Sequence, residues 1–194
     1  MQNSKVSHLI VVLREAAIES SRGKDWRPRL ALLLWFVYTF FRYLNDPLYS
    51  CIISPLNLGI HELGHLLFSP FGTLIGVFGG TLLQLLVPLL GMLNFYRQQD
   101  FFAIFLCFGW LSVNLFDVAK YIADARAMSL PLVTPFGLAG SVIHDWNYLL
   151  GQLNLLQFDI FIAWLVKAAA VIAMLICFAG GGCLLRVMKE GRAG

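Results

Sequence analysis

Two histidines and a glutamate on one turn of a predicted helix could bind a metal ion and activate a water molecule. Residues 59–68 read Gly-Ile-His-Glu-Leu-Gly-His-Leu-Leu-Phe, which contains an H-E-x-x-H pattern. On a helix, His61 and His65 lie above one another on one face, so both imidazoles can bind one tetrahedral ion. Glu62 would then reach a water at the metal and act as a general base. In soluble proteins the same pattern also arises by chance, as two surface histidines near a glutamate.

The surroundings of this motif favour the metal site. Apart from the motif itself, residues 51–96 carry no charged side chain. A glutamate in an apolar membrane segment is costly, and it is kept where it faces the protein interior and has a partner or a task. Two of the four histidines in the chain fall on this one turn. We therefore interpret His61 and His65 as metal ligands and Glu62 as a catalytic residue.

The composition is that of an integral membrane protein. Of the 194 residues, 59% are hydrophobic and 13% are charged, whereas about 25% are charged in typical soluble domains. The net charge is +3, and the basic residues gather near the two ends of the chain. This distribution is typical of topology signals and argues against a nucleic-acid-binding surface. We expect the inner or plasma membrane of a bacterium or archaeon, with the N-terminus on the cytoplasmic side.

The predicted fold class is all-α, a polytopic transmembrane helix bundle with five to six membrane segments in one domain, residues 1–194. Residues 1–29 would form a cytoplasmic amphipathic and basic segment, residues 30–188 the bundle and residues 189–194 a basic tail. Apolar runs predict crossings at 30–44, 51–68, 73–95, 101–125 and 158–185. Prolines and glycines interrupt residues 132–157, which predicts a broken or re-entrant segment covered by protein or water.

The crossing that follows the motif carries small residues and one amide. Gly76, Gly79 and Gly80 would let a neighbouring helix approach closely, so we favour packing against the motif helix over a catalytic role. Gln84 lies farther along the same apolar segment. A buried amide needs a hydrogen-bond partner, so we expect Gln84 to have one.

A polar stripe runs along the second half of the crossing at 101–125. Its members are Asn114, Asp117, Tyr121 and Asp124, which at about 100° per residue project within an arc of roughly 80°. Such a stripe faces other protein or a water-filled cavity. Asp117 could also simply pair with Lys120.

A catalytic zinc site needs a third protein ligand and one open position for water. We propose Asp124 and His144 as candidate metal ligands. Asp124 is expected at the same depth in the membrane as His65, and His144 offers an imidazole, which suits zinc. Asp145 or Asp124 could orient the His144 ring. Each candidate has an alternative: Asp124 could form a salt bridge with Arg126, and His144 could be a core histidine bonded to its own segment.

The sequence resembles the site-2 protease class of intramembrane zinc metalloproteases over about residues 52–125. The resemblance rests on His61-Glu62-Leu63-Gly64-His65 in a hydrophobic helix, on Gly79-Gly80 just after it, and on Asn114, Asp117 and Asp124 in a later crossing. It implies a Zn²⁺ ion held by the two histidines and a distant aspartate, with Glu62 as the base. The chain has no Asp-Gly pair of the kind that supplies the third ligand in that class, and no PDZ-like insertion.

The predicted function is a membrane-embedded zinc-dependent hydrolase that cleaves a peptide bond of a transmembrane protein. Glu62 would accept the proton of the attacking water and return it to the leaving group. The residues that we expect to contact substrate or to orient the ligands are Asn114, Asp117, Tyr121 and Asp145. A lipid amide or ester hydrolase would use the same chemistry on a membrane lipid. A non-enzymatic metal-binding, structural or transport protein would instead close the site with four ligands.

Overall fold

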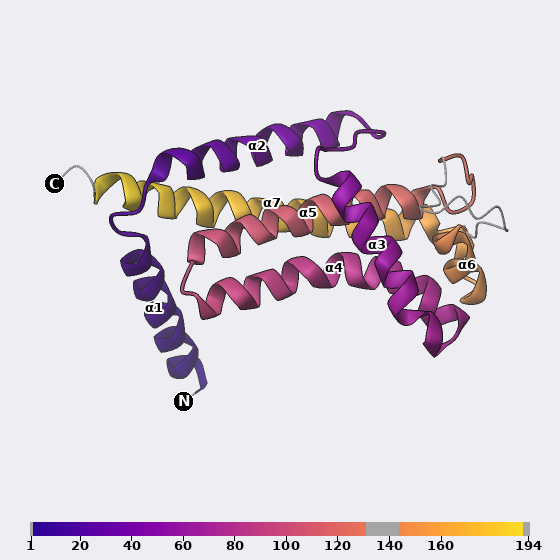
Figure 1. The fold of residues 1–194 in the computed structure, drawn as a ribbon, viewed down its shortest axis with the longest axis horizontal. Helices are drawn as coiled ribbons and strands as arrows, with labels where there is room; N and C mark the ends of the chain where they lie inside the picture. The colour runs from indigo at the N-terminus through magenta and orange to yellow at the C-terminus, as the bar shows by residue number, and fades with distance from the viewer. Residues whose placement is uncertain (1, 131–143, 192–194) are drawn as a thin grey trace.

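The computed structural model describes residues 2–130 and 144–191, and these residues form helices and no strand, as the sequence predicts. Its helices are α1 (Gln2–Ser21), α2 (Trp26–Asn45), α3 (Ser54–Phe68), η1 (Ser69–Phe71), α4 (Thr73–Arg97), α5 (Phe101–Ala123), α6 (Asp145–Gln152), η2 (Leu156–Phe158) and α7 (Asp159–Glu190). Four of the long helices, α2, α4, α5 and α7, run along the length of the molecule (Figure 1). The shorter helix α3 runs across α5 and α4, near the end of the molecule where α6 lies.

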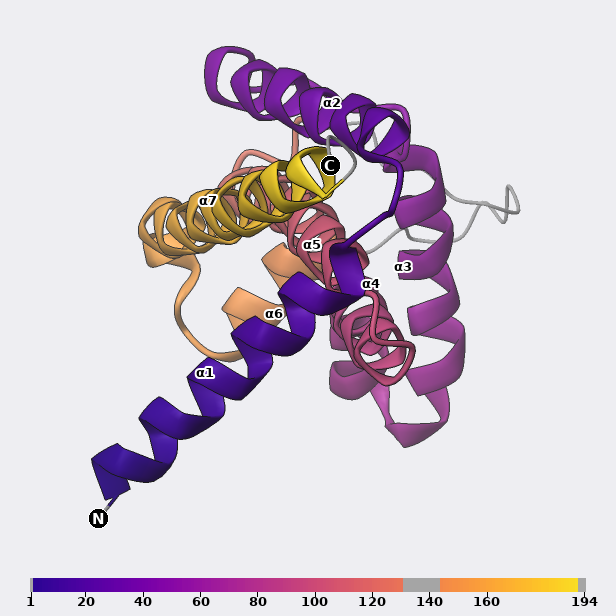
Figure 2. The ribbon, with the colours of Figure 1, turned by 90° about the vertical axis from the view of Figure 1, so that its left-hand side faces the viewer.

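Helix α5 is the centre of the bundle. It packs along α7 and α4, and α2 lies against α5 and α7; Figure 2 views this arrangement from the end where α1 lies. The largest group of buried apolar side chains joins α2, α5 and α7, and includes Phe36, Phe40, Val113, Phe116 and Met174. This packing holds α5 in place, so the side chains on its polar stripe have fixed positions relative to α3 and α4.

Three segments are long and apolar enough to cross a membrane, namely Thr73–Arg97, Phe101–Ala123 and Leu156–Glu190. Large apolar side chains such as Leu89, Leu90 and Trp164 are exposed on their outer faces, as lipid-facing side chains would be. The described residues thus fit an integral membrane protein. The expectation of five to six crossings is supported for these three alone.

The other two predicted crossings form helices that are short or charged. Helix α3 has 15 residues, so at about 1.5 Å per residue it is shorter than the roughly 30 Å hydrocarbon core. Helix α2 carries Arg27, Arg29 and Arg42. Of the predicted broken segment, residues 132–143 lie outside the described residues, and the remainder forms α6 and η2.

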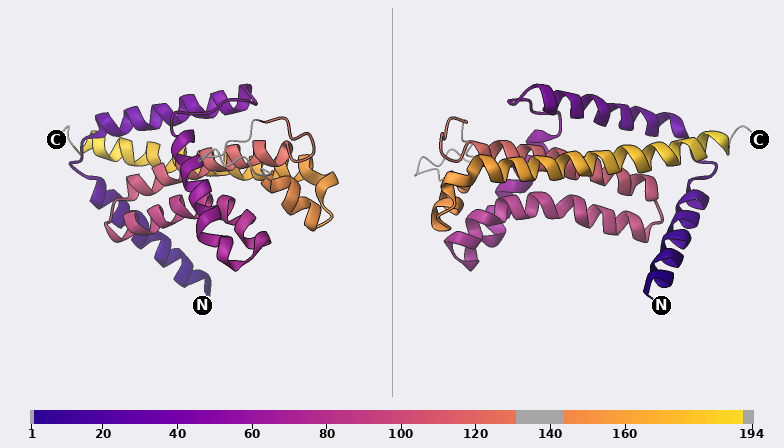
Figure 3. Two further views of the ribbon diagram at one scale, coloured as in Figure 1. Left: turned by 45° about the vertical axis from the view of Figure 1, so that its right-hand side comes forward. Right: turned by 180° about the vertical axis from the view of Figure 1, so that it is seen from behind.

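The predicted N-terminal helix is present as α1, which lies at the end of the bundle opposite α6 (Figure 3). The predicted end of the motif helix is also observed, since α3 stops at Phe68 and the short η1 turn follows. Gly72 then adopts a φ of 101°, a conformation that glycine reaches without steric cost. This sharp turn folds α4 back against α3 and brings the glycines of α4 to the histidines of α3.

Candidate metal centre

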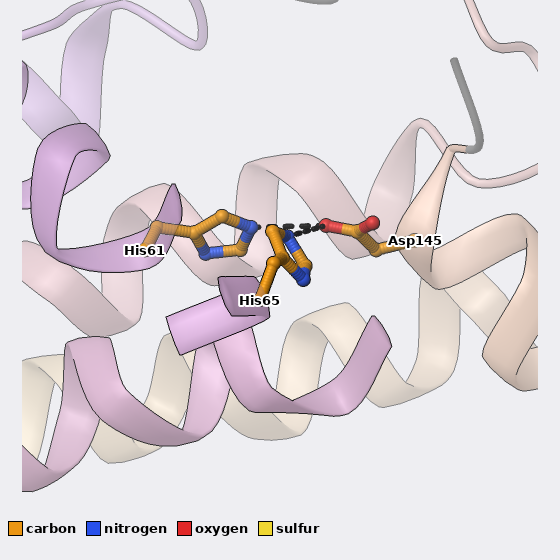
Figure 4. A group of neighbouring side chains, drawn as sticks. All are labelled: His61, His65 and Asp145. Carbon is orange, nitrogen blue, oxygen red and sulfur yellow. Dashed lines mark hydrogen bonds and ion pairs between the residues drawn. The ribbon is translucent and has the colours of Figure 1, made fainter. Parts of the chain in front are cut away.

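His61 and His65 lie one turn apart on the side of α3 that faces α4. His61 is buried and His65 is half-buried. Their ring centroids are 4.7 Å apart and their planes make an angle of 83°. Both rings point toward Asp145 (Figure 4). The helical spacing of the motif therefore brings the two imidazoles to a common point, as the sequence predicts.

Asp145, the first residue of α6, completes a group of three side chains. Its Oδ2 lies 2.9 Å from Nε2 of His61 and 3.2 Å from Nε2 of His65. One potential ligand atom from each of the three residues lies within 4.8 Å of the other two. Two imidazoles and one carboxylate are a ligand set that suits a divalent metal ion. This buried group could therefore hold a metal ion.

The hydrogen bonds on the far side of each ring determine which nitrogen faces this group. Nδ1 of His65 lies 2.9 Å from the carbonyl oxygen of Gly76, which can only accept a hydrogen bond, so Nδ1 carries a proton. Nδ1 of His61 lies 3.0 Å from Oε1 of Gln84 and donates to it. Both Nε2 atoms then face the Asp145 carboxylate. A proton or a metal ion must lie between such groups, because an imidazole lone pair and a carboxylate oxygen repel each other.

The charge of Asp145 fits a ligand as well. Burial raises the pKa of the Asp145 carboxyl, but hydrogen bonds and electrostatic attraction from His61 and His65 outweigh burial and hold this pKa below its usual range. The carboxyl is therefore ionised at neutral pH. Its backbone N–H donates to the hydroxyl of Tyr121 at 3.2 Å, which ties the start of α6 to α5.

Gly80 packs directly against the imidazole rings of both histidines. A Cβ atom at this position would lie 2.6 Å from Nε2 of His65 and 2.7 Å from Nε2 of His61. A zinc ion binds imidazole nitrogen at about 2.0–2.1 Å, so a methyl group at position 80 would crowd the same two nitrogens that an ion would need. The residues present fit a metal ion because their ligand atoms lie within 4.8 Å of one another and glycine at position 80 places no side chain against the two Nε2 atoms.

No protein-family model, curated protein or solved structure matches the chain. A fold by itself does not determine a function, so the chemistry must come from the geometry of the site. That geometry includes, beside the three converging ligand groups, the one acidic residue of the motif.

Glu62 lies between the two histidines in the sequence and is partly buried. Its carboxylate interacts electrostatically with His61, His65 and Asp145. Among the described residues it accepts no hydrogen bond and forms no salt bridge. A carboxylate that lies beside a candidate metal centre and is not held by a hydrogen bond from the described residues is free to take and release a proton.

Close packing of α3 on α4 positions the two histidines. A Cβ atom at Gly64 would overlap the carbonyl oxygen of Gly79 and lie 2.8 Å from Cα of Gly80, so the two backbones are in direct contact. A Cβ at Gly79 would in turn lie 2.5 Å from Cβ of Phe68. The predicted role of the glycines in packing against the motif helix is confirmed. Gly80 packs against the side chains of the two histidines as well as against the α3 backbone.

His144 and Asp124, which we expected as metal ligands, contact each other instead of the two histidines. Nε2 of His144 lies 3.3 Å from Oδ2 of Asp124, and Nδ1 of His144 accepts a hydrogen bond from the backbone N–H of Asn147 at 3.2 Å. His144 therefore caps the start of α6, which is the alternative of a core histidine bonded to its own segment. Arg126 binds Asp159 at 2.8 Å, so the alternative salt bridge with Asp124 is not formed.

The structure places the remaining predicted site residues in separate environments. Asn114 is fully buried, and both ends of its side-chain amide bond to Gln84. Asp117 accepts hydrogen bonds from Tyr43 and Ser54 and lies 3.5 Å from Nζ of Lys120. The ring centroid of Tyr121 lies 6.3 Å from that of His61. The stripe thus faces other protein, as expected, but only Tyr121 reaches the metal centre directly.

Sequence reasoning named Asp145 as an orienting residue, whereas the structure places it against both histidines. The side chains of the adjacent residues His144 and Asp145 point in different directions at the start of α6. The sequence offered no sign of this direction, because no periodic pattern extends across the start of so short a helix. The contact of the Gly76 carbonyl with His65 had no sequence signal either, since any residue supplies a carbonyl.

Proposed function

We propose that this chain is a membrane-embedded zinc-dependent hydrolase that cleaves a peptide bond within a transmembrane segment. One observation carries the proposal: Nε2 of His61 and of His65 both face a carboxylate oxygen of Asp145, at 2.9 Å and 3.2 Å, beside the unengaged Glu62. Zinc fits this set because its protein sites combine imidazole and carboxylate ligands, and three protein ligands leave a tetrahedral position for water. The resemblance of the motif region to site-2 proteases points to the same chemistry.

Each of the four residues has a distinct role in the proposed hydrolysis. His61, His65 and Asp145 would hold the ion, and a bound zinc ion would supply Lewis acidity, which lowers the pKa of water and polarises a substrate carbonyl. Glu62 accepts a proton from the attacking water and delivers it to the nitrogen of the departing amine. Each turnover then leaves Glu62 ionised again, so the carboxylate acts first as a base and then as an acid.

Tyr121 is the residue best placed to stabilise negative charge on the substrate oxygen. Its hydroxyl oxygen accepts from the Asp145 N–H, and its own hydrogen has no acceptor among the described residues. Asn114, the other residue that we considered for this role, uses its amide nitrogen and its amide oxygen on Gln84. We therefore assign the oxyanion contact to Tyr121, as a single neutral donor.

The experiment that tests the proposal compares wild type with Glu62→Gln and His65→Ala. The purified proteins, in lipid vesicles, are offered a dye-labelled transmembrane peptide library, a ceramide-type amide and a phospholipid ester, and products are identified by mass spectrometry. We expect Glu62→Gln to keep bound zinc and lose hydrolysis, and His65→Ala to lose both. Glu190→Gln, an exposed glutamate at the end of α7, serves as the matched control.

Each outcome of this experiment has a defined meaning. Cleavage of peptide alone supports the proposed substrate class, and cleavage of a lipid alone replaces it with lipid hydrolysis at the same site. Zinc bound without hydrolysis of any of the three substrates supports a non-enzymatic metal site. Normal turnover by Glu62→Gln would falsify the general-base assignment.

A further inference from the structure

The interior of α4 contains a backbone carbonyl that has lost its helical hydrogen bond. In an α-helix the N–H of residue i donates to the carbonyl of residue i−4, and Pro88 lies inside α4. Proline has no N–H, so the carbonyl oxygen of Gln84 receives no hydrogen bond from its own helix. In a membrane-spanning helix such a group must be satisfied by a neighbouring element, because lipid cannot donate to it.

Asn114 on α5 satisfies this carbonyl. Its Nδ2 lies 3.1 Å from the backbone oxygen of Gln84. A carbonyl only accepts hydrogen bonds, so this contact determines which end of the Asn114 amide is nitrogen. The opposite end, Oδ1, then faces the Gln84 side chain and accepts from its Nε2 at 3.2 Å. Asn114 is fully buried and Gln84 is 6% exposed, so no water competes for these bonds.

The orientation of Gln84 determines the proton position on His61. With Nε2 of Gln84 directed at Asn114, its Oε1 must face the other way, toward Nδ1 of His61 at 3.0 Å. An amide oxygen accepts and cannot donate, so Nδ1 of His61 carries a proton. The lone pair of the neutral ring then lies on Nε2, the nitrogen that faces Asp145 and lies close to Gly80.

We propose that Gln84 and Asn114 are positioning residues for the metal centre. They form a directional relay, from the carbonyl that Pro88 leaves free, through Asn114 and Gln84, to Nδ1 of His61. The relay fixes the ring orientation of His61 and reserves its Nε2 for the metal. The metal part of this inference rests on the proposed function, whereas the proton position on His61 does not.

The two histidines differ in the group that accepts the hydrogen bond from Nδ1. His65 donates to the backbone carbonyl of Gly76 on α4, a group that no side-chain substitution removes. His61 depends on two side chains, one from α4 and one from α5. Loss of an outer-shell partner of a ligating histidine costs about 10–100-fold in metal affinity, so substitution in the relay should weaken zinc binding through His61 alone.

Nuclear magnetic resonance of ¹⁵N-histidine-labelled protein in detergent tests the relay without any activity measurement. We expect the wild type, with and without zinc, to show a slowly exchanging Nδ1–H of His61, assigned by its absence from His61→Ala. Gln84→Met should lose this signal and bind zinc about 10–100-fold more weakly in a chelator competition. Gln84→Glu keeps an acceptor for Nδ1 and should retain the signal. Gln98→Met, an exposed glutamine at the end of α4, is the matched control.

The relay is overturned if Gln84→Met keeps both the protected Nδ1–H and the wild-type zinc affinity. Should Gln84→Met not fold, the wild type alone decides, because a rapidly exchanging or absent Nδ1–H on His61 contradicts the relay. A wild type that shows the Gln84-dependent signal but binds no zinc supports the relay and refutes the zinc hydrolase. Zinc binding that depends on Gln84, without hydrolysis of any substrate, likewise supports the relay and refutes only the hydrolase.

Discussion

Oδ2 of Asp145 lies 2.9 Å from Nε2 of His61, although 84 residues separate the two in the chain. The histidine comes from α3 and the aspartate from the start of α6. The two ligands therefore meet only when both helices are in their folded positions. The contact depends on two further attachments of α6. The Asp145 N–H donates to Tyr121, and His144 binds Asp124 at the end of α5. The candidate metal centre is therefore a property of the tertiary fold more than of the motif.

Replacing Asp145 by asparagine is expected to weaken zinc binding by more than the roughly 10–100-fold that an outer-shell partner contributes, because it removes the single anionic ligand. Chelator competition on the purified protein measures this affinity. Asp117→Asn is the matched control, since Asp117 is half-buried and bonds to Tyr43 and Ser54 away from the histidines. A larger loss of affinity in Asp117→Asn than in Asp145→Asn would place the third ligand on the stripe of α5 instead.

Replacing Gly80 by alanine should abolish zinc binding although it changes none of the three ligand residues. The new Cβ would lie 2.6 Å and 2.7 Å from the two Nε2 atoms, so both imidazole rings would have to shift away from the positions in which they face Asp145. Alanine is otherwise favoured over glycine inside a helix by roughly 0.5–1 kcal/mol. Gly59→Ala on α3, where a Cβ would meet no atom within 4 Å, should bind zinc normally. Full zinc occupancy in Gly80→Ala, measured by elemental analysis, would show that the ion lies elsewhere.

The sequence was sufficient to predict the helices and much of the motif region. Apolar runs mark the three helices that are long and apolar enough to cross a membrane, because a helix in lipid must be predominantly apolar. The small size of Gly79 and the isolated polarity of Gln84 likewise indicated a close helix approach and a buried partner. Each of these features depends on the residue itself and on its immediate segment, and such features can be recognised in one sequence.

Other features depend on how distant segments meet. The apolar run at 51–68 suggested a full crossing, but the helix begins only at Ser54 and ends at Phe68. His144 and Asp145 are neighbours in the chain, so chemistry alone favoured the imidazole as the third ligand. In the structure the two residues have different roles. His144 caps α6 by accepting a hydrogen bond from the Asn147 N–H, whereas Asp145 points to the two histidines. That outcome requires the position of α6 relative to α3, which no local pattern contains.

The Asp124 carboxylate should make the stability of the protein depend on pH. Its two oxygens accept hydrogen bonds from Ser129, Leu130 and His144. Burial raises the pKa of Asp124, but these hydrogen bonds outweigh burial and lower the pKa below its usual value. A carboxyl whose pKa is lower in the folded state contributes stability that is complete above its unfolded pKa and is lost as the pH falls through its folded pKa.

Thermal unfolding of wild type and Asp124→Asn across a pH series measures this contribution. We expect the variant to unfold at lower temperature at neutral pH, and the difference to shrink as the pH is lowered below the ordinary carboxyl range. Glu19→Gln is the control, because the Glu19 side chain forms an exposed ion pair with Arg22, and exposed pairs contribute about 0–1 kcal/mol. A difference for Asp124→Asn that stays constant with pH would rule out an ionised, hydrogen-bonded Asp124 as its source.

Replacing Tyr121 by phenylalanine separates two roles of its hydroxyl group. If this hydroxyl donates to the substrate oxygen in the transition state, kcat should fall by roughly 10²–10³-fold, as for loss of one oxyanion donor, with zinc affinity unchanged. If its main role is to accept from the Asp145 N–H at 3.2 Å, zinc affinity and kcat should fall together. Tyr148→Phe on α6, whose hydroxyl makes no hydrogen bond to the described residues, is the control. We predict the first result, because the hydroxyl hydrogen of Tyr121 has no acceptor in the described chain; an unchanged kcat would remove Tyr121 from the mechanism.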